Sequence, residues 1–240
     1  MFSKAIELYL AKNGFATFRP KAVLFDMDGV LFDSMPLHAK SWAKISEEFG
    51  LHMTHEDVYM YEGRTGAATI NLLAEHYWKR SATPEEIEHI YEEKCRLFNS
   101  YPKASKMAGA DTVLEKVESN GLMTLVVTGS GQASLLSRLE SNYPGHFPIE
   151  RVVSSKDVKF GKPHPEPYLM GLEKAGVKPW EAIVVENAPL GVRAGVAAQI
   201  FTVAVNTGPL ADEVLLQEGA NALFPSMTAF AENLEQLIGK

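Results

Sequence analysis

The chain has 240 residues, of which 46% are hydrophobic and 22% are charged, as expected of a folded protein with one large domain or two unequal ones. Its net charge of −7 at pH 7 argues against a nucleic-acid partner or an anionic membrane, since both need a basic face. No apolar stretch approaches the roughly 20 residues of a membrane span, and the N-terminus lacks the pattern of a signal peptide. The single cysteine, Cys95, excludes an internal disulfide and suits a reducing cytoplasm, where we expect it to be inert.

The order of apolar and amphipathic stretches predicts the fold class. MFSKAIELYLAKNG at the start predicts a short amphipathic helix that ends at Gly14. Short apolar runs rich in β-branched residues then predict buried parallel strands. These runs are AVLFD (22–26), TLVVT (124–128), RVVSS (151–155), AIVVE (182–186) and IFTVAV (200–205). Amphipathic stretches such as 109–121 and 166–176, each closed by a glycine, predict helices between them. This alternation predicts an α/β fold built on a doubly wound parallel sheet.

Residues 34–103 interrupt the alternation. They contain no convincing strand but several helical patterns, one of which spans 84–101 with Thr83 as N-cap and Glu86 three residues later. The segment is too long for one crossover, so we expect an inserted helical cap domain over the carboxyl ends of the strands. The predicted organisation is an N-terminal helical extension (1–19), a core domain (20–33 and 104–240) and the cap (34–103).

Polar residues stand at the carboxyl ends of the predicted strands, where doubly wound sheets bind ligands. They are Asp26 and Asp28 after the first strand, Thr128, Gly129 and Ser130 after the second, Lys162 in the loop after the third, and Glu186 and Asn187 after the fourth. Carboxylates this close repel one another unless a cation or a reaction uses them. The set therefore predicts a site for a divalent cation and an anionic substrate.

In order and approximate spacing, DMDGVLFDS, TGS, the lysine of GKP and VVENAPLGVRAG resemble the four motifs of the haloacid dehalogenase superfamily. The helical insert resembles the cap of its β-phosphoglucomutase-like branch. The resemblance covers the chain from residue 20 onward, leaves residues 1–19 outside, and implies a Rossmann-like core that catalyses phosphoryl transfer.

The resemblance also implies roles for the motif residues. Asp26 is the expected nucleophile, which forms an aspartyl-phosphate, and Asp28 the expected general acid and base. Thr128, Gly129 and Ser130 are expected to hold the phosphoryl oxygens, and Lys162 to offset their charge. The expected cofactor is Mg²⁺, bound among Asp26, Asp28, Glu186 and Asn187, with Glu186 orienting bound water or Lys162.

Two departures from the family pattern bear on the substrate. Asn187 stands where an aspartate is usual, and the cap sequence YMYEGRTG (59–66) has Glu62 and Gly66 where β-phosphoglucomutases carry a lysine and an arginine. The phosphate-binding cation is therefore absent or moved to Arg64. Glu62 is either a ligand of the metal shell or a solvated loop residue, and His38, at the position of a cap histidine of that branch, is a site residue or a packed polar one.

The cap sequence EGRTG (62–66), taken together with Glu186 and Asn187, resembles the pattern of a small sub-branch that includes an inorganic pyrophosphatase. We therefore expect a phosphohydrolase that acts on pyrophosphate or another small phosphate. The alternatives are a β-phosphoglucomutase or sugar-phosphate phosphatase, and a weakly active phosphate-binding protein. The cap leaves the site largely self-contained, which is compatible with a monomer.

Overall fold

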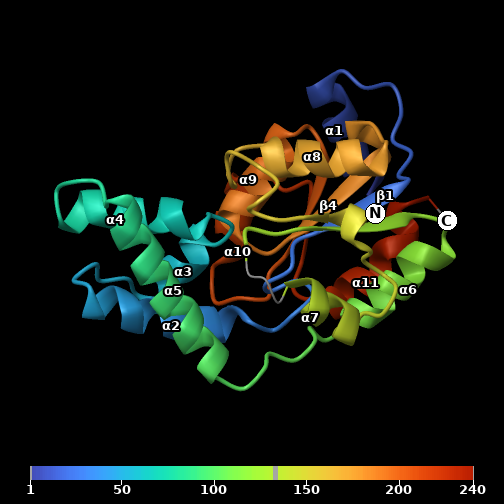
Figure 1. The fold of residues 1–240 in the computed structure, drawn as a ribbon. Helices are drawn as coiled ribbons and strands as arrows, with labels where there is room; N and C mark the ends of the chain where they lie inside the picture. Colours follow the sequence, from blue (N-terminus) through green and yellow to red (C-terminus); the bar gives the residue numbers. More distant parts are fainter. Residues whose placement is uncertain (1, 132–134, 240) are drawn as a thin grey trace.

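A computed structural model describes residues 2–131 and 135–239. Within them, six parallel strands form one sheet in the order β3-β2-β1-β4-β5-β6 (Figure 1). The strands are β1 (Ala22–Phe25), β2 (Met123–Val127), β3 (Val152–Val153), β4 (Ala182–Glu186), β5 (Phe201–Val205) and β6 (Ala222–Phe224). Leu24 of β1 pairs with Leu125 of β2 on one side and Val184 of β4 on the other, so β1 lies in the centre. The predicted doubly wound parallel sheet is confirmed.

The strand predictions differ from the structure at the two sheet edges. β3 keeps only Val152 and Val153 of the predicted RVVSS. β6 was not predicted, because its three residues, ALF, are too short for a periodic signal. Both are edge strands, which have a neighbour on one side only.

Alternate side chains of the central strands pack into two separate apolar clusters. Val23 and Phe25 of β1 enter the apolar cluster under helices α6 (Ala110–Ser119) and α11 (Met227–Leu237), whereas Ala22 and Leu24 enter the cluster under α8 (Glu166–Ala175). Every residue of β1 is fully buried, as expected for a strand covered on both faces.

The covering helices follow the strands in chain order. They are α6 (Ala110–Ser119), α7 (Leu135–Asn142), α8 (Glu166–Ala175), α9 (Pro189–Ala197), α10 (Asp212–Gln217) and α11 (Met227–Leu237), with short 3₁₀ turns at Ile149–Arg151 and Pro179–Glu181. Among the described helices, none is long and apolar enough to cross a membrane.

The predicted N-terminal helix is present as α1 (Ser3–Asn13), and Gly14 ends it with a left-handed φ of 70°. Phe2 and Tyr9 bury their rings in the larger core cluster. The Tyr9 hydroxyl donates to the carbonyl of Gln199 at 2.9 Å, which ties the helix to the sheet end.

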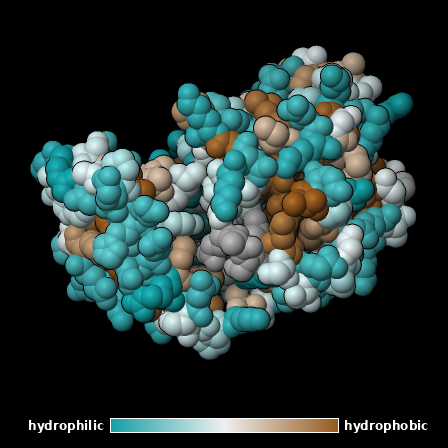
Figure 2. All heavy atoms as spheres, viewed as in Figure 1, coloured by the Kyte–Doolittle hydropathy of each residue, from teal (hydrophilic) through white to brown (hydrophobic). Residues whose placement is uncertain are grey.

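Residues 34–103 form the helices α2 (Met35–Glu48), α3 (His55–Tyr61), α4 (Gly66–Tyr77) and α5 (Pro84–Ser100). They make a lobe beside the sheet, with an apolar core of their own that includes Trp42, Ile70 and Ile90 (Figure 1). Its surface is mostly hydrophilic (Figure 2), as expected when the apolar faces of these helices are turned inward. The predicted capping box at the start of α5 is present, because Thr83 accepts from the amide of Glu86 and Glu86 accepts from the amide of Thr83.

Candidate active site

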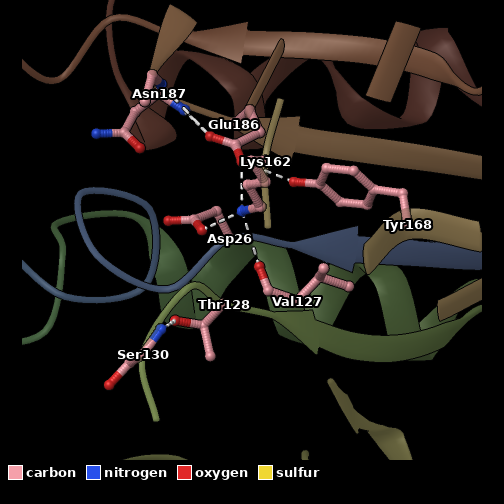
Figure 3. Close-up of polar contacts among 9 residues, drawn as sticks. Asp26, Val127, Thr128, Ser130, Lys162, Tyr168, Glu186 and Asn187 are labelled. Carbon is pink, nitrogen blue, oxygen red and sulfur yellow. Dashed lines mark hydrogen bonds and ion pairs between the residues drawn. The ribbon is translucent and has the colours of Figure 1, made fainter. Parts of the chain in front are cut away.

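Because the strands are parallel, the polar residues after β1, β2 and β4 lie at one edge of the sheet (Figure 3). Asp26 follows β1, Thr128 follows β2, and Glu186 ends β4. Lys162 enters from the loop that precedes α8. These residues are buried, each with no more than 4% of its surface exposed. The structure therefore brings together the core residues that the sequence singled out.

Lys162 makes hydrogen bonds to residues at the ends of β1, β2 and β4. Its Nζ donates to Asp26 Oδ1 at 2.5 Å, to Glu186 Oε1 at 2.6 Å and to the carbonyl of Val127 at 2.9 Å (Figure 3). Burial alone would lower the pKa of Lys162, but the two carboxylates outweigh it and raise the pKa above its ordinary value. Lys162 is thus a fixed buried cation beside Asp26.

All four lone pairs of the Glu186 carboxylate have donors. Oε1 accepts from Lys162 and, at 2.7 Å, from the hydroxyl of Tyr168, and Oε2 accepts from the amides of Asn187 and Ala188. Gly191 of α9 makes space for this carboxylate because it has no side chain. A Cβ at position 191 would lie 1.9 Å from Glu186 Oε1. This geometry favours Glu186 as the residue that positions Lys162, and metal ligation by Glu186 stays a prediction.

Two acceptors at the same edge lack donors. Asp26 Oδ2 and Asn187 Oδ1 are buried and have no hydrogen-bond partner among the described residues. Burial raises the pKa of Asp26, and Lys162 lowers it less than burial, Glu186 and Asp28 together raise it. A buried oxygen without a hydrogen-bond donor reduces the stability of the fold. We therefore expect a cation beside these two atoms.

The donor set fits Mg²⁺ in kind. Within the described part of the chain, no cluster of three or more His, Cys, Asp or Glu side chains is arranged for a metal. Asp26, Asp28 and Asn187 offer two carboxylates and one amide, and Mg²⁺ commonly takes one or two protein carboxylates while keeping waters and substrate phosphate oxygens. Gly29, with a φ of 92°, lets the motif loop pass Asn187, because a Cβ there would lie 2.0 Å from Asn187 Nδ2.

Asp28 is held through one oxygen. Its Oδ1 accepts from the Ser34 hydroxyl at 2.5 Å and lies 3.4 Å from His38 Nε2 and 3.7 Å from Arg138 Nη1. Burial alone would raise the pKa of Asp28, but His38 and Arg138 outweigh it and lower the pKa below its ordinary value. Asp28 is therefore an ionised carboxylate in this state, held by Ser34, His38 and Arg138.

Two cations of the site were not predicted. Lys94 of α5 is buried, and its Nζ lies 2.9 Å from His38 Nδ1. A charged residue four positions after the buried Ile90 on an amphipathic helix was an available signal for Lys94. Arg138 of α7 had no such signal, because nothing around it in the sequence marks the site.

The loop that is predicted to bind phosphate, residues 128–130, contains a hydrogen bond of its own. Thr128 Oγ1 accepts from the amide of Ser130 at 3.1 Å (Figure 3). Gly129 lets the cap approach, since a Cβ there would lie 3.0 Å from the carbonyl oxygen of Gly63. A side chain at position 129 would therefore press against the cap loop.

The cap residues face the same cavity. The cavity has about 480 Å³ of space, part of it open to solvent. Its lining includes Asp28, His38, Glu62, Arg64, Lys94 and Ser130. Burial, and then the charge of Asp28, raise the pKa of Glu62 from 4.5 to about 7. Glu62 therefore lines the cavity, whereas its ligation of a metal stays a prediction.

Arg64 lies on the cavity wall, and its Nε is buried without a hydrogen-bond partner among the described residues. A side chain at position 66 would collide with Tyr91, since a Cβ on Gly66 would lie 2.3 Å from the ring. The structure therefore has no room at position 66 for the arginine of the β-phosphoglucomutases, and Arg64 is the nearby cation.

The family model for haloacid dehalogenase-like hydrolases matches residues 23–205, which span the sheet from β1 to β5 and the helical lobe. The chain belongs to this family. A solved structure from Bacteroides vulgatus, provisionally described as a β-phosphoglucomutase, is 58% identical, covers 98% of this chain and 96% of its own, and has a TM-score of 0.95. The predicted family, its β-phosphoglucomutase-like branch and the Rossmann-like fold are confirmed.

Curated relatives of this haloacid dehalogenase-like hydrolase carry two kinds of name. A "Phosphorylated carbohydrates phosphatase" from Thermotoga maritima is 31% identical over 85% of this chain and 93% of its own. A "Pyrophosphatase PpaX" from Oceanobacillus iheyensis is 26% identical over 77% of this chain and 83% of its own. The preference for pyrophosphate is not confirmed, because the more similar carbohydrate phosphatase and the 58% identical structure favour the sugar-phosphate alternative.

Proposed function

We propose that the chain is an Mg²⁺-dependent phosphohydrolase that acts on a small phosphorylated compound through an aspartyl-phosphate on Asp26. The observation that carries the proposal is the buried Lys162, which binds one oxygen of Asp26 and leaves the other without a donor. A carboxylate with one oxygen fixed and one open at the cavity edge is suited to attack phosphorus.

The reaction has two steps. In the first, Asp26 Oδ2 forms a bond to phosphorus and the bond to the leaving oxygen breaks. Asp28, which must take up a proton from solvent as the anionic substrate binds, gives that proton to the leaving oxygen. In the second, Asp28 takes a proton from water, whose oxygen attacks phosphorus and releases Asp26 and inorganic phosphate. Thr128, Gly129 and Ser130 would hold the phosphoryl oxygens, and the charge of Lys162 would offset theirs. Asp26, Asp28 and Asn187 would bind Mg²⁺, which supplies charge neutralisation to the transferring group.

The helices of residues 34–103 act as a cap in this proposal. The cap loop contacts the core through backbone, because a Cβ on Gly63 would lie 3.1 Å from Lys162 Cδ, and one on Gly161 would lie 2.8 Å from Thr65 Cγ2. This close approach shields the reacting atoms from bulk water. A single chain supplies every residue of the site, so a monomer would be sufficient. The single cysteine is compatible with a reducing cytoplasm.

For the substrate, the relatives favour a phosphorylated carbohydrate. A second candidate, pyrophosphate, rests on Glu62, which faces the cavity where sugar-phosphate enzymes of the branch carry a cation. An anionic Glu62 would repel the phosphate of a sugar phosphate. If Glu62 instead reached the ligand shell of Mg²⁺, the charge of the metal would offset its own and it could close over a substrate as small as pyrophosphate. In that case Glu62→Ala should lower kcat/KM for pyrophosphate and raise it for sugar phosphates relative to pyrophosphate. An equal change with both substrates, or none, would remove Glu62 as a specificity residue.

The test is phosphate release from a panel of pyrophosphate, hexose phosphates and nucleotides with added Mg²⁺. We expect turnover that requires Asp26: Asp26→Asn should abolish it while the far-UV circular dichroism stays unchanged. Asp33→Asn is the matched control, since Asp33 is an exposed aspartate of the same motif. If the protein binds phosphate but turns over no substrate of the panel, the result would instead support the alternative of a weakly active phosphate-binding protein.

A further inference from the structure

We propose that Thr207 is a positioning residue for the Mg²⁺ site, because its hydroxyl holds the loop after β1 in place. That loop carries Asp28, which would bind the metal together with Asn187 of the loop after β4. Thr207 lies in the turn after β5, which none of the four sequence motifs includes. The inference rests on the Mg²⁺ site of the proposed function and adds a residue that would not touch the metal itself.

The order of the strands places the turn after β5 beside the site. β5 pairs with β4, and Ala204 lies opposite Glu186, so the turn that follows β5 is next to Asn187. The Thr207 hydroxyl donates to the carbonyl of Gly29 at 2.6 Å, which joins two loops 178 positions apart in the sequence. No backbone amide of the described residues donates to this carbonyl, so the hydroxyl of Thr207 satisfies it.

Gly29 has little room to move on its other side. Its φ is 92°, and a Cβ at this position would lie 2.0 Å from Asn187 Nδ2, so the backbone of Gly29 packs directly against the Asn187 side chain. Asn187 Oδ1 is the buried acceptor that lacks a donor. Thr207 therefore holds the residue that follows Asp28 against the side chain of the other expected ligand. Residues that orient metal ligands in this way affect metal affinity without touching the metal.

Thr207 itself lies in a turn that is held from two sides. The amide of Asn206 donates to the carbonyl of Phe224 in β6 at 2.8 Å, which fixes the turn to the edge of the sheet. On the side of the cap, a Cβ on Gly208 would lie 2.9 Å from the ring of Tyr59 in α3. Because the turn is anchored independently of the loop after β1, its hydroxyl can set the position of that loop.

The experiment measures the affinity for Mg²⁺ by calorimetry, and kcat and KM on the best substrate of the panel. Thr207→Val keeps the branched shape of the side chain and removes its hydroxyl. It should raise Kd for Mg²⁺ by about 10-fold, as is typical when a group that orients a metal ligand is lost, and lower kcat more than it changes KM. Thr207→Ser keeps a hydroxyl and should recover most of the affinity for Mg²⁺. Thr112→Val is the matched control, because Thr112 is an exposed threonine of α6.

Urea unfolding in EDTA separates the positioning of the metal site from a purely structural role. If Thr207→Val lowered the free energy of unfolding but left Kd for Mg²⁺ unchanged, Thr207 would only support the fold, and the inference would be overturned. An equal loss of affinity in Thr207→Ser and Thr207→Val would overturn it too, because the hydroxyl would not be responsible. A wild type that binds Mg²⁺ but hydrolyses no substrate would contradict the proposed function, while the Mg²⁺ titration would still decide the inference.

Discussion

Replacing Lys162 by Met should destabilise the protein as well as stop turnover. Lys162 is 1% exposed at its side chain and neutralises Asp26 and Glu186, whose side chains are 5% and 1% exposed. Met has similar length and no charge, so the variant leaves two buried carboxylates without their cation. Removing one partner of a buried ion pair costs about 3–5 kcal/mol. In a chain of this size, 1 kcal/mol shifts Tm by about 2–4 °C, so we expect a fall of roughly 10 °C.

The assay is urea and thermal unfolding in EDTA, so that bound metal does not contribute. Lys159→Met is the matched control, because Lys159 is an exposed lysine of the same loop. Glu186→Gln in the Lys162→Met background removes one of the stranded charges and should recover part of the loss, which a double-mutant cycle measures. The destabilisation should also shrink at low pH, where the stranded carboxylates can take up protons.

A loss of less than about 1 kcal/mol for Lys162→Met, within the range of an exposed ion pair, would refute this reasoning. Strict additivity of Lys162→Met and Glu186→Gln would refute it as well, since residues 2.6 Å apart in a buried site must be coupled.

Three further variants test other parts of the site. Asp28→Asn should keep phosphate binding but lose about 10²–10⁴-fold in kcat, and a loss of only a few-fold with every leaving group would assign the proton to another residue. The pKa of Glu62 is raised from 4.5 to about 7, so folding takes up a proton between these pH values and stability falls as pH rises through them. Without metal, Glu62→Gln should therefore stabilise the protein by roughly 3 kcal/mol at pH 8 and by little at pH 4, and a pH-independent effect in urea unfolding would contradict this. Gly191→Ala should destabilise the fold and impair activity together, because its Cβ would lie 1.9 Å from Glu186 Oε1; wild-type stability and kcat would show that Glu186 can move freely.

The sheet and the residues at its carboxyl edge could be predicted from the sequence. Buried parallel strands are continuous apolar runs, and a strand that ends in Asp26 or Glu186 must present that side chain at the same edge as its neighbours. Local patterns were sufficient for this, because each strand end is contiguous in sequence with the strand that positions it. The same holds for the Thr83 capping box of α5, whose two bonds join residues three apart.

Only the tertiary structure decided how the charges around those residues are paired. Lys94 reaches His38 across 56 positions, and Arg138 reaches Asp28 from a helix that follows another strand. No local pattern encodes which charged side chain of a distant helix faces the site, since that depends on how the helix packs. The hydrogen bonds of Glu186 also became visible only at this level. Its oxygens accept from Lys162 and Tyr168, which lie in the loop and helix before β4, and from backbone amides after it. The sequence by itself determines which groups reach the sheet edge, whereas three-dimensional packing determines which of their atoms remain open for a metal and a substrate.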